Sequence, residues 1–149
     1  AIDGAFACVL AVLYGGTVMR LWQGVASTLL GPDALTGGMK TTLIGVGMHV
    51  GVAFTWSAVY LVALQTSSAL RRTRVSRFGI LKIAVFYGPF IWMVMSLAVI
   101  PSMLHRFPPI TVRWWVNFFG HVLFVAVPIA LGIGKPAEPV HRSSERTAV

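Results

Sequence analysis

Hydrophobic and polar positions follow one another along this chain in long blocks. Residues 4–19, 41–64, 80–103 and 114–133 are mainly apolar, and short polar or basic segments separate them. A helix needs about 20 mainly apolar residues to cross the roughly 30 Å hydrocarbon core of a bilayer. The pattern therefore predicts an all-α integral membrane protein built as a bundle of four transmembrane helices.

The segment after the first apolar block has a different period. In residues 20–30 the apolar positions recur every fourth residue, and polar residues such as Gln23 lie off that stripe. This spacing is typical of a helix that lies in the membrane interface. A straight helix over residues 4–30, at about 1.5 Å per residue, would overshoot the bilayer. We therefore expect a bend near Arg20 and a short interfacial helix between the first and second spans.

Composition supports a membrane environment. Of the 149 residues, 56% are hydrophobic and 11% are charged, whereas soluble domains carry about 25% charged residues. The net charge of +8 could indicate a nucleic-acid partner. The basic residues gather at the ends of the apolar blocks, however, which is the pattern of a membrane protein and argues against nucleic acid.

The basic residues also predict an orientation. The densest basic block lies within residues 65–77, close to Lys82, and cytoplasmic loops carry an excess of Lys and Arg. We expect this block in the cytoplasm of a bacterial inner membrane, with both termini on the same side. The chain then divides into a transmembrane domain, residues 1–134, and a polar cytoplasmic tail, residues 135–149.

Glycines and prolines indicate how the second and later spans pack. Gly45, Gly47 and Gly51 form a narrow stripe that permits close approach of another helix, while His49 and Tyr60 lie on roughly the opposite face. Ordinary packing within the bundle explains such a stripe, and docking of a helix from another membrane subunit is the alternative.

Prolines predict the shape of the later spans. Pro89 predicts a kink in the third span and Pro128 a kink in the fourth, while Pro101 predicts the outer end of the third.

Two histidines within the spans are candidate ligands. His49 and His121 lie about eight and seven residues inside the outer ends of their spans, a rise of about 12 Å, so their imidazoles should lie at similar depth. Opposed imidazoles can hold haem b, and one imidazole can hold the magnesium of bacteriochlorophyll. The alternative is that each histidine bonds a neighbouring polar residue, Asn117 for His121 and Tyr60 for His49.

The remaining chemistry is sparse. Spans two, three and four contain no Asp or Glu, which disfavours an ion-coupled transporter with a buried carboxylate. No catalytic or nucleotide-binding motif is present, and the single cysteine, Cys8, supports no disulfide or metal motif. Arg20, Gln23 and Asp33 lie in the first connector, where Arg20 and Asp33 bracket the interfacial helix and could pair. The sequence therefore nominates no enzyme activity and no metal site.

The first connector resembles that of a family of small uncharacterised bacterial inner-membrane proteins. Residues 20–38 read RLWQGVASTLLGPDALTGG, and Pro101 and the run 121–128 are also similar. The positions that carry the pattern are Arg20, Ala26-Ser27, Leu29-Leu30-Gly31, Gly37-Gly38 and His49. Thr28 stands where the family pattern has glycine. The resemblance implies the same membrane topology and brings no activity with it.

Three functions are compatible with these observations. The first is a non-catalytic integral membrane subunit that packs against other subunits of a respiratory or photosynthetic complex. The second is a small anchor that binds haem b or bacteriochlorophyll through His49 and His121. The third is a permease for a small solute.

Overall fold

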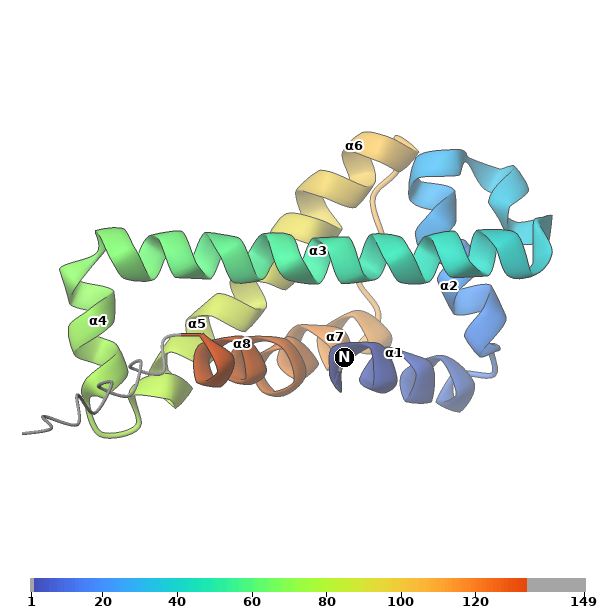
Figure 1. Ribbon diagram of the computed structural model, residues 1–149. Helices are drawn as coiled ribbons and strands as arrows, with labels where there is room; N and C mark the ends of the chain where they lie inside the picture. Colours follow the sequence, from blue (N-terminus) through green and yellow to red (C-terminus); the bar gives the residue numbers. More distant parts are fainter. Residues whose placement is uncertain (1, 134–149) are drawn as a thin grey trace, which may run out of the picture.

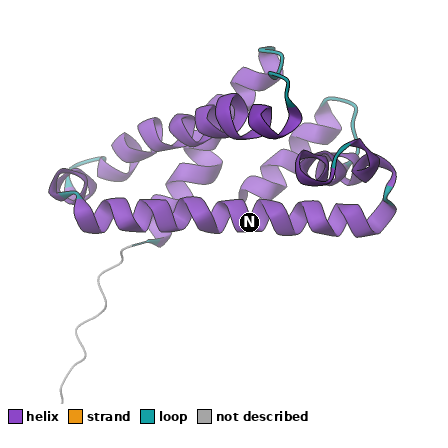
Figure 2. Ribbon diagram, turned by 90° about the horizontal axis from the view of Figure 1, so that it is seen from above, coloured by secondary structure: helices purple, strands orange, loops and turns teal. Residues whose placement is uncertain are grey.

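The computed structural model describes residues 2–133, which fold entirely into helices and their connections (Figures 1 and 2). The expected tail, residues 135–149, lies outside the described residues. Three helical segments are long and apolar enough to cross a membrane: α3 (Gly38–Thr66), the continuous segment Gly79–Leu104, and the segment Val112–Gly132. Each agrees with an expected span to within three residues at either end, so these segments are confirmed as helices that are long and apolar enough to span a membrane.

The first apolar block does not form one long helix. It divides into α1 (Ile2–Leu13) and α2 (Val18–Leu30), whose axes are bent by 115°. With 12 residues, α1 is about 18 Å long and does not cross a roughly 30 Å hydrocarbon core by itself. The expected single helix over residues 4–19 is therefore wrong, although the bent pair together meets the requirements for a span.

The sequence explains where this break occurs. Gly15 adopts a φ of +74°, which side-chain-bearing residues rarely adopt, and so turns the chain after α1. Thr17 then caps α2, because its hydroxyl accepts a hydrogen bond of 3.1 Å from the Arg20 amide. The bend consequently lies between Leu13 and Val18, earlier than the position near Arg20 that hydrophobicity suggested.

Helix α2 crosses α3 at a steep angle near one end of α3 (Figure 1), and its expected position in the membrane interface stays a prediction. Its buried side is formed by Trp22, Gln23 and Ala26. The Gln23 amide donates to the Gly38 carbonyl at 3.2 Å, which ties α2 to the first turn of α3 across the short helix η1 (Pro32–Thr36). The apolar stripe of this helix thus packs against protein along part of its length.

A short helix, α4 (Ser68–Val75), occupies the basic segment that the sequence suggested was a loop. The Ser67 hydroxyl caps its first turn by accepting from the Leu70 amide at 3.2 Å. The Arg71 guanidinium donates to the Leu64 and Gln65 carbonyls at 3.1 and 2.6 Å, so it satisfies the C-terminal end of α3. Helix α4 therefore closes one end of the molecule (Figure 1).

Two prolines widen the spanning helices. The third segment runs α5 (Gly79–Val94), the π-helical turn η2 (Met95–Val99) and α6 (Ile100–Leu104). The fourth runs α7 (Val112–His121), the π-helical turn η3 (Val122–Ala126) and α8 (Val127–Gly132). Pro101 and Pro128 each follow the end of a π-turn by two residues, so each turn is centred on the carbonyl that the proline ring would otherwise strike. Pro101 therefore lies within a helix and does not end it, while Pro89 is accommodated within α5.

Three of the glycines that permit close contacts between helices lie near the two histidines. A Cβ atom on Gly45 would lie 1.9 Å from the Trp22 carbonyl oxygen, and one on Gly88 would lie 2.6 Å from the His121 backbone. A Cβ atom on Gly120 would meet the Phe6 ring at 2.5 Å. These contacts join α2 to α3, α5 to α7, and α1 to α7, and all three lie beside the two intramembrane histidines.

Candidate functional site

The polar groups within the spans gather where α1, α3 and α7 meet. His49 on α3 faces Asp3 in the first turn of α1, and its Nε2 lies 3.3 Å from the Asp3 Oδ2. The two side chains are only 24% and 19% exposed. Since the residues around them are apolar, the carboxylate and the imidazole are each other's natural partner. The ion pair exists when His49 is protonated, so its strength depends on where the proton resides.

His121 lies on the other side of this junction. Its Nδ1 is 2.7 Å from the Asn117 carbonyl oxygen, and donation to that carbonyl leaves Nε2 as the nitrogen with a free lone pair. Helix α1, which carries Asp3, packs against both histidine-bearing helices. The three side chains are here called the Asp–His cluster: Asp3, His49 and His121.

His49 and His121 lie near the midpoints of their helices. The midpoint of α3, which spans residues 38–66, is residue 52, and His49 is three residues from it, or about 4.5 Å along the axis. The midpoint of the segment Val112–Gly132 is residue 122, one residue from His121. Similar depth for the two histidines stays a prediction, because these positions are counted along each helix separately. An ionisable group near the middle of a spanning helix is costly unless it is paired and usually has a function.

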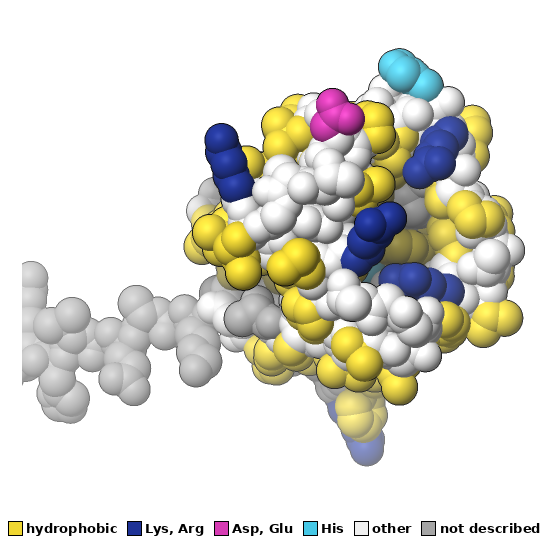
Figure 3. Space-filling model, turned by 90° about the vertical axis from the view of Figure 1, so that its right-hand side faces the viewer, with side chains coloured by type: hydrophobic (Ala, Val, Ile, Leu, Met, Phe, Trp, Pro, Cys, Tyr) yellow, Lys and Arg dark blue, Asp and Glu magenta, His cyan; other side chains and the backbone are white. Residues whose placement is uncertain are grey.

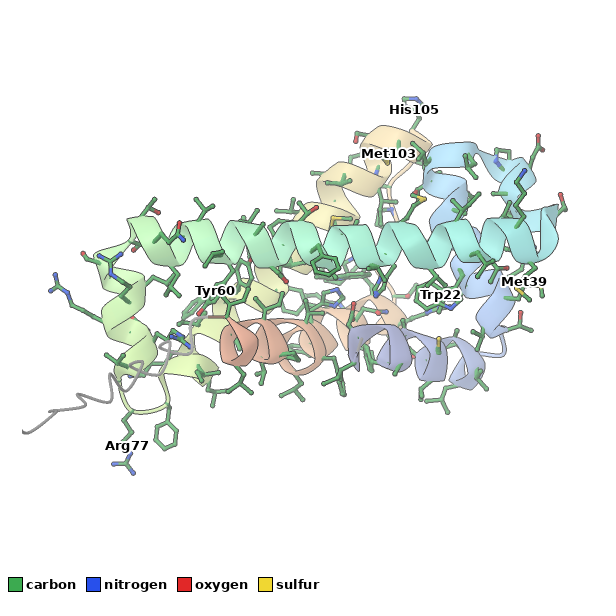
Figure 4. All side chains as sticks on the ribbon, in the orientation of Figure 1. Trp22, Met39, Tyr60, Arg77, Met103 and His105 are labelled. Atoms are coloured by element: carbon green, nitrogen blue, oxygen red, sulfur yellow. The ribbon has the colours of Figure 1, made fainter. Side chains whose placement is uncertain are left out.

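Aromatic rings wall the cluster on two sides. The Trp22 ring lies 5.1 Å from the His49 ring, and the Trp92 ring lies 4.8 Å from the His121 ring. Figure 4 shows Trp22 reaching from α2 into the space beneath α3. On the α1 side, Phe6 stacks on Phe124 with ring centroids 4.4 Å apart. These rings shield the polar groups and hold α1 against the fourth spanning segment.

The geometry offers a haem or bacteriochlorophyll only part of what such a group needs. His121 has the arrangement of a ligand histidine, with one nitrogen bonded to a carbonyl and the other free. The Nε2 of His49, however, is engaged by Asp3. A cavity of about 600 Å³ forms an apolar groove between α5 and the α7–η3 segment, and neither histidine lines it. No group of three metal-binding side chains within residues 2–133 is placed to hold a metal ion.

The other candidate residues are distributed around this site. Gly45 packs against α2, whereas Gly47 and Gly51 have no atoms near the position of an added Cβ. Arg20 and Asp33 form no ion pair within the described part of the chain, and Gln23 serves as a link to α3. His105, labelled in Figure 4, projects from the end of α6 away from the cluster. His141 lies outside the described residues.

Sequence reasoning located the two histidines and named Asn117 as the neighbour of His121, but it suggested Tyr60 as the partner of His49, which contacts Asp3 instead. Asp3 lies 46 positions from His49, and only the fold of α1 against α3 brings them together. Gly88, which permits α5 to approach the His121 backbone, was visible only as part of the Tyr87-Gly88-Pro89 sequence. A glycine between a tyrosine and a proline in an apolar span is a usable signal of close approach, although it does not identify the neighbour.

Comparison with known proteins adds no relative. No family model, no curated protein and no solved structure matches this chain. The resemblance to a family of bacterial inner-membrane proteins therefore stays a hypothesis, and the function must be inferred from the site itself.

Proposed function

We propose that this protein handles protons within the membrane through the Asp–His cluster. The observation that carries the proposal is the 3.3 Å contact between the His49 Nε2 and the Asp3 Oδ2 near the middle of α3. Chains of Asp, Glu and His side chains at membrane depth are typical of proton relays. The carboxylate that the later spans lack is supplied here by α1.

The arrangement supports transfer of a proton through the cluster. A proton shared by His49 and Asp3 occupies a short polar contact that aromatic rings separate from lipid. His121, with its Nδ1 bonded to the Asn117 carbonyl, presents Nε2 as a proton acceptor. We propose that the proton passes between the Asp3–His49 pair and His121.

Proton flux in proteoliposomes tests this proposal. Protein is reconstituted with a pH-sensitive dye inside the vesicles, and a potassium diffusion potential drives proton entry. We expect His49→Gln and His121→Gln to lower the protein-dependent flux on the order of tenfold or more, since general acid–base groups contribute at least this much. His105→Gln is the matched control and should keep the flux. Vesicles with wild-type protein that admit protons no faster than empty vesicles would exclude the proposal.

A second proposed function is that of a subunit in a larger membrane complex, with α3 as the docking helix. Only 6% of the spanning window of α3 is buried, compared with 28% for each of the other two spans. Gly47 and Gly51 leave an open groove on this exposed side, and small residues four apart permit a close helix–helix contact. The partner is a transmembrane helix of another subunit, for which respiratory and photosynthetic complexes of a bacterial inner membrane are the candidates.

Purification in a mild detergent tests the subunit proposal. We expect defined membrane subunits to co-purify with the wild-type protein, and Gly47→Leu with Gly51→Leu to remove them. Gly132→Leu, at another open glycine, should leave the complex intact. A visible spectrum of the same preparation tests the haem and bacteriochlorophyll hypothesis through the Soret or far-red bands. Solute uptake in the proteoliposomes tests the permease hypothesis.

A further inference from the structure

The end of the molecule that α4 closes carries a group of exposed cations. They are Arg72 on α4, Arg77 in the turn after it, and Lys82 near the start of α5. Arg71 does not belong to this group, because its guanidinium caps the end of α3. Figure 4 shows Arg77 pointing away from the body of the molecule. The three exposed cations are here called the basic tip.

No carboxylate in the described part of the chain balances the basic tip. The acidic residues within residues 2–133 are Asp3 and Asp33. Asp3 belongs to the Asp–His cluster, and Asp33 lies in η1, which precedes the first turn of α3, whereas α4 follows its last turn. Figure 3, which views the end away from α4, shows an acidic side chain among its Lys and Arg side chains. The Lys82 Nζ contacts a neutral group, the Ser76 hydroxyl, at 3.5 Å. The basic tip therefore attracts an anionic partner.

A tight turn presents an aromatic ring beside these cations. Phe78 is 64% exposed and has a φ of +59°, in the left-handed region that residues with side chains rarely adopt. Gly79 permits the turn, because a Cβ atom there would collide with the Thr73 carbonyl oxygen. The Arg77 guanidinium lies 5.1 Å from the centre of the Phe78 ring, and Val75 nearby is 85% exposed. An exposed aromatic ring on a strained backbone is unfavourable in water, so this combination favours a partner that offers an apolar phase next to its negative charge.

The position of the basic tip along the helices identifies that partner. The midpoints of the two adjoining spanning segments are residue 52 in α3 and residues 91 and 92 in Gly79–Leu104. Ser68, which begins α4, lies about 24 Å from the first midpoint, and Lys82 lies about 14 Å from the second, counted along the helix axes. The hydrocarbon core ends about 15 Å from the bilayer centre, and the headgroups reach to about 20–22 Å. Spans centred in the bilayer therefore bring the tip to the level of the lipid headgroups.

We propose that the basic tip binds the headgroups of anionic phospholipids in the bilayer that holds the protein. Arg72, Arg77 and Lys82 bind the headgroup phosphates, since guanidinium and ammonium groups donate strong hydrogen bonds to phosphate oxygens and basic clusters beside a spanning helix attract anionic lipids. The Phe78 ring lies at the boundary between headgroups and acyl chains, where apolar side chains of interfacial segments are buried. The proposal concerns lipid selectivity and is independent of proton handling by the Asp–His cluster.

Native mass spectrometry of the full chain, released from neutral detergent micelles, measures lipid binding directly. Phosphatidylglycerol is titrated in one arm, and phosphatidylcholine, whose headgroup contains phosphate but has no net charge, in the other. We expect phosphatidylglycerol to bind on the order of tenfold or more tightly, because each basic residue near an anionic surface contributes about fivefold. A higher concentration of ammonium acetate should reduce this preference, since salt screens exposed charges.

Matched variants test whether the preference comes from the basic tip. Replacing its three cations with glutamine should remove most of the preference for phosphatidylglycerol. The control variant replaces two arginines and one lysine that are exposed and remote from α4, namely Arg20, Arg106 and Lys40. It loses the same charge and should keep the preference, as should a variant with Arg72→Lys and Arg77→Lys. Equal binding of the two lipids by the wild-type protein would overturn the proposal, as would an equal loss of preference in the glutamine variant and its control.

Discussion

The absence of a side chain at Gly45 allows α2 to pack closely against α3. Alanine there would place its Cβ 1.9 Å from the Trp22 carbonyl oxygen, a backbone atom that no side-chain rotation can move away. We predict that Gly45→Ala destabilises the protein by about 1–3 kcal/mol, as overpacking typically does. Unfolding of the micelle-bound protein by added dodecyl sulfate, followed by circular dichroism, measures this loss.

Gly47→Ala is the matched control for that substitution. Nothing lies within 4 Å of a Cβ atom at Gly47, so only the helix propensity changes, in favour of alanine by about 1 kcal/mol. Equal unfolding midpoints for the two variants would show that α2 does not approach α3 at Gly45. The two glycines are two residues apart and look alike in the sequence; only the packing separates their roles.

Tyr87 links α5 to α3 at the residue scale. Its hydroxyl donates to the Trp56 carbonyl at 2.6 Å, and its ring packs edge-on against the Trp56 ring. Tyr87→Phe keeps the ring and removes the hydrogen bond, so we predict a loss of about 0.5–1.5 kcal/mol. Tyr14→Phe, at a ring that is 47% exposed, should change stability little. A loss at Tyr14 as large as that at Tyr87 in the same unfolding assay would contradict this assignment.

At the scale of elements, the π-helical turns η2 and η3 accommodate a proline in each of two spanning helices, because they move the carbonyl that the proline ring would strike. Each turn is centred four residues before a proline, at Leu97 for Pro101 and at Phe124 for Pro128. We predict that Pro128→Ala restores an amide donor and converts η3 to α-helix, which rotates α8 relative to His121. Backbone ¹³C chemical shifts and amide exchange over residues 122–126 report the change.

Pro89→Ala is the control for the proline substitution. Pro89 lies within α5, and no widened turn precedes it. The helix around residue 85 should therefore keep its hydrogen-bond pattern when Pro89 is replaced. If η3 persists in Pro128→Ala, packing around Gly120 and His121 causes the wide turn, and Pro128 is compatible with the turn without causing it.

Hydrophobic periodicity predicted the elements whose structure depends on residues close together in the sequence. The three long spans follow from apolar length alone, because a bilayer imposes that length. The break after α1 was missed, since Tyr14 and Gly15 continue an apolar block while the backbone turns at Gly15. The Gly-Gly-Thr sequence at positions 15–17 was the available signal, with a turn residue followed by an N-cap.

The candidate site was predictable only in part, because local patterns in the sequence do not report contacts between distant residues. Counting residues from the ends of the spans placed His49 and His121 at one depth, because helical rise is fixed. The pairing of His49 with Asp3 depends on the bend after α1 and on the close contacts at Gly45 and Gly120. No periodicity in the sequence reports a contact between residues so far apart in the chain.

At the scale of the whole molecule, basic residues are denser at one end than at the other, and this difference predicts an orientation. Arg71, Arg72, Arg74, Arg77 and Lys82 belong to the end closed by α4, and Arg77 marks that end in Figure 4. Met39 lies at the opposite end in the same view. Because Lys and Arg in short loops are retained in the cytoplasm, we expect the α4 end to face inward.

Cysteine labelling in intact cells measures this orientation. In a Cys8→Ala background, single cysteines replace Val75 on α4, which is 85% exposed, and Met39 on α3, which is 61% exposed. A membrane-impermeant maleimide should label Met39→Cys in spheroplasts and Val75→Cys only after the membrane is opened. Replacing Arg72 and Arg77 with glutamine should weaken this preference, since neither is the Arg71 side chain that caps α3. Labelling of Val75→Cys from outside would place the basic end outward and reverse the side from which the Asp–His cluster is approached.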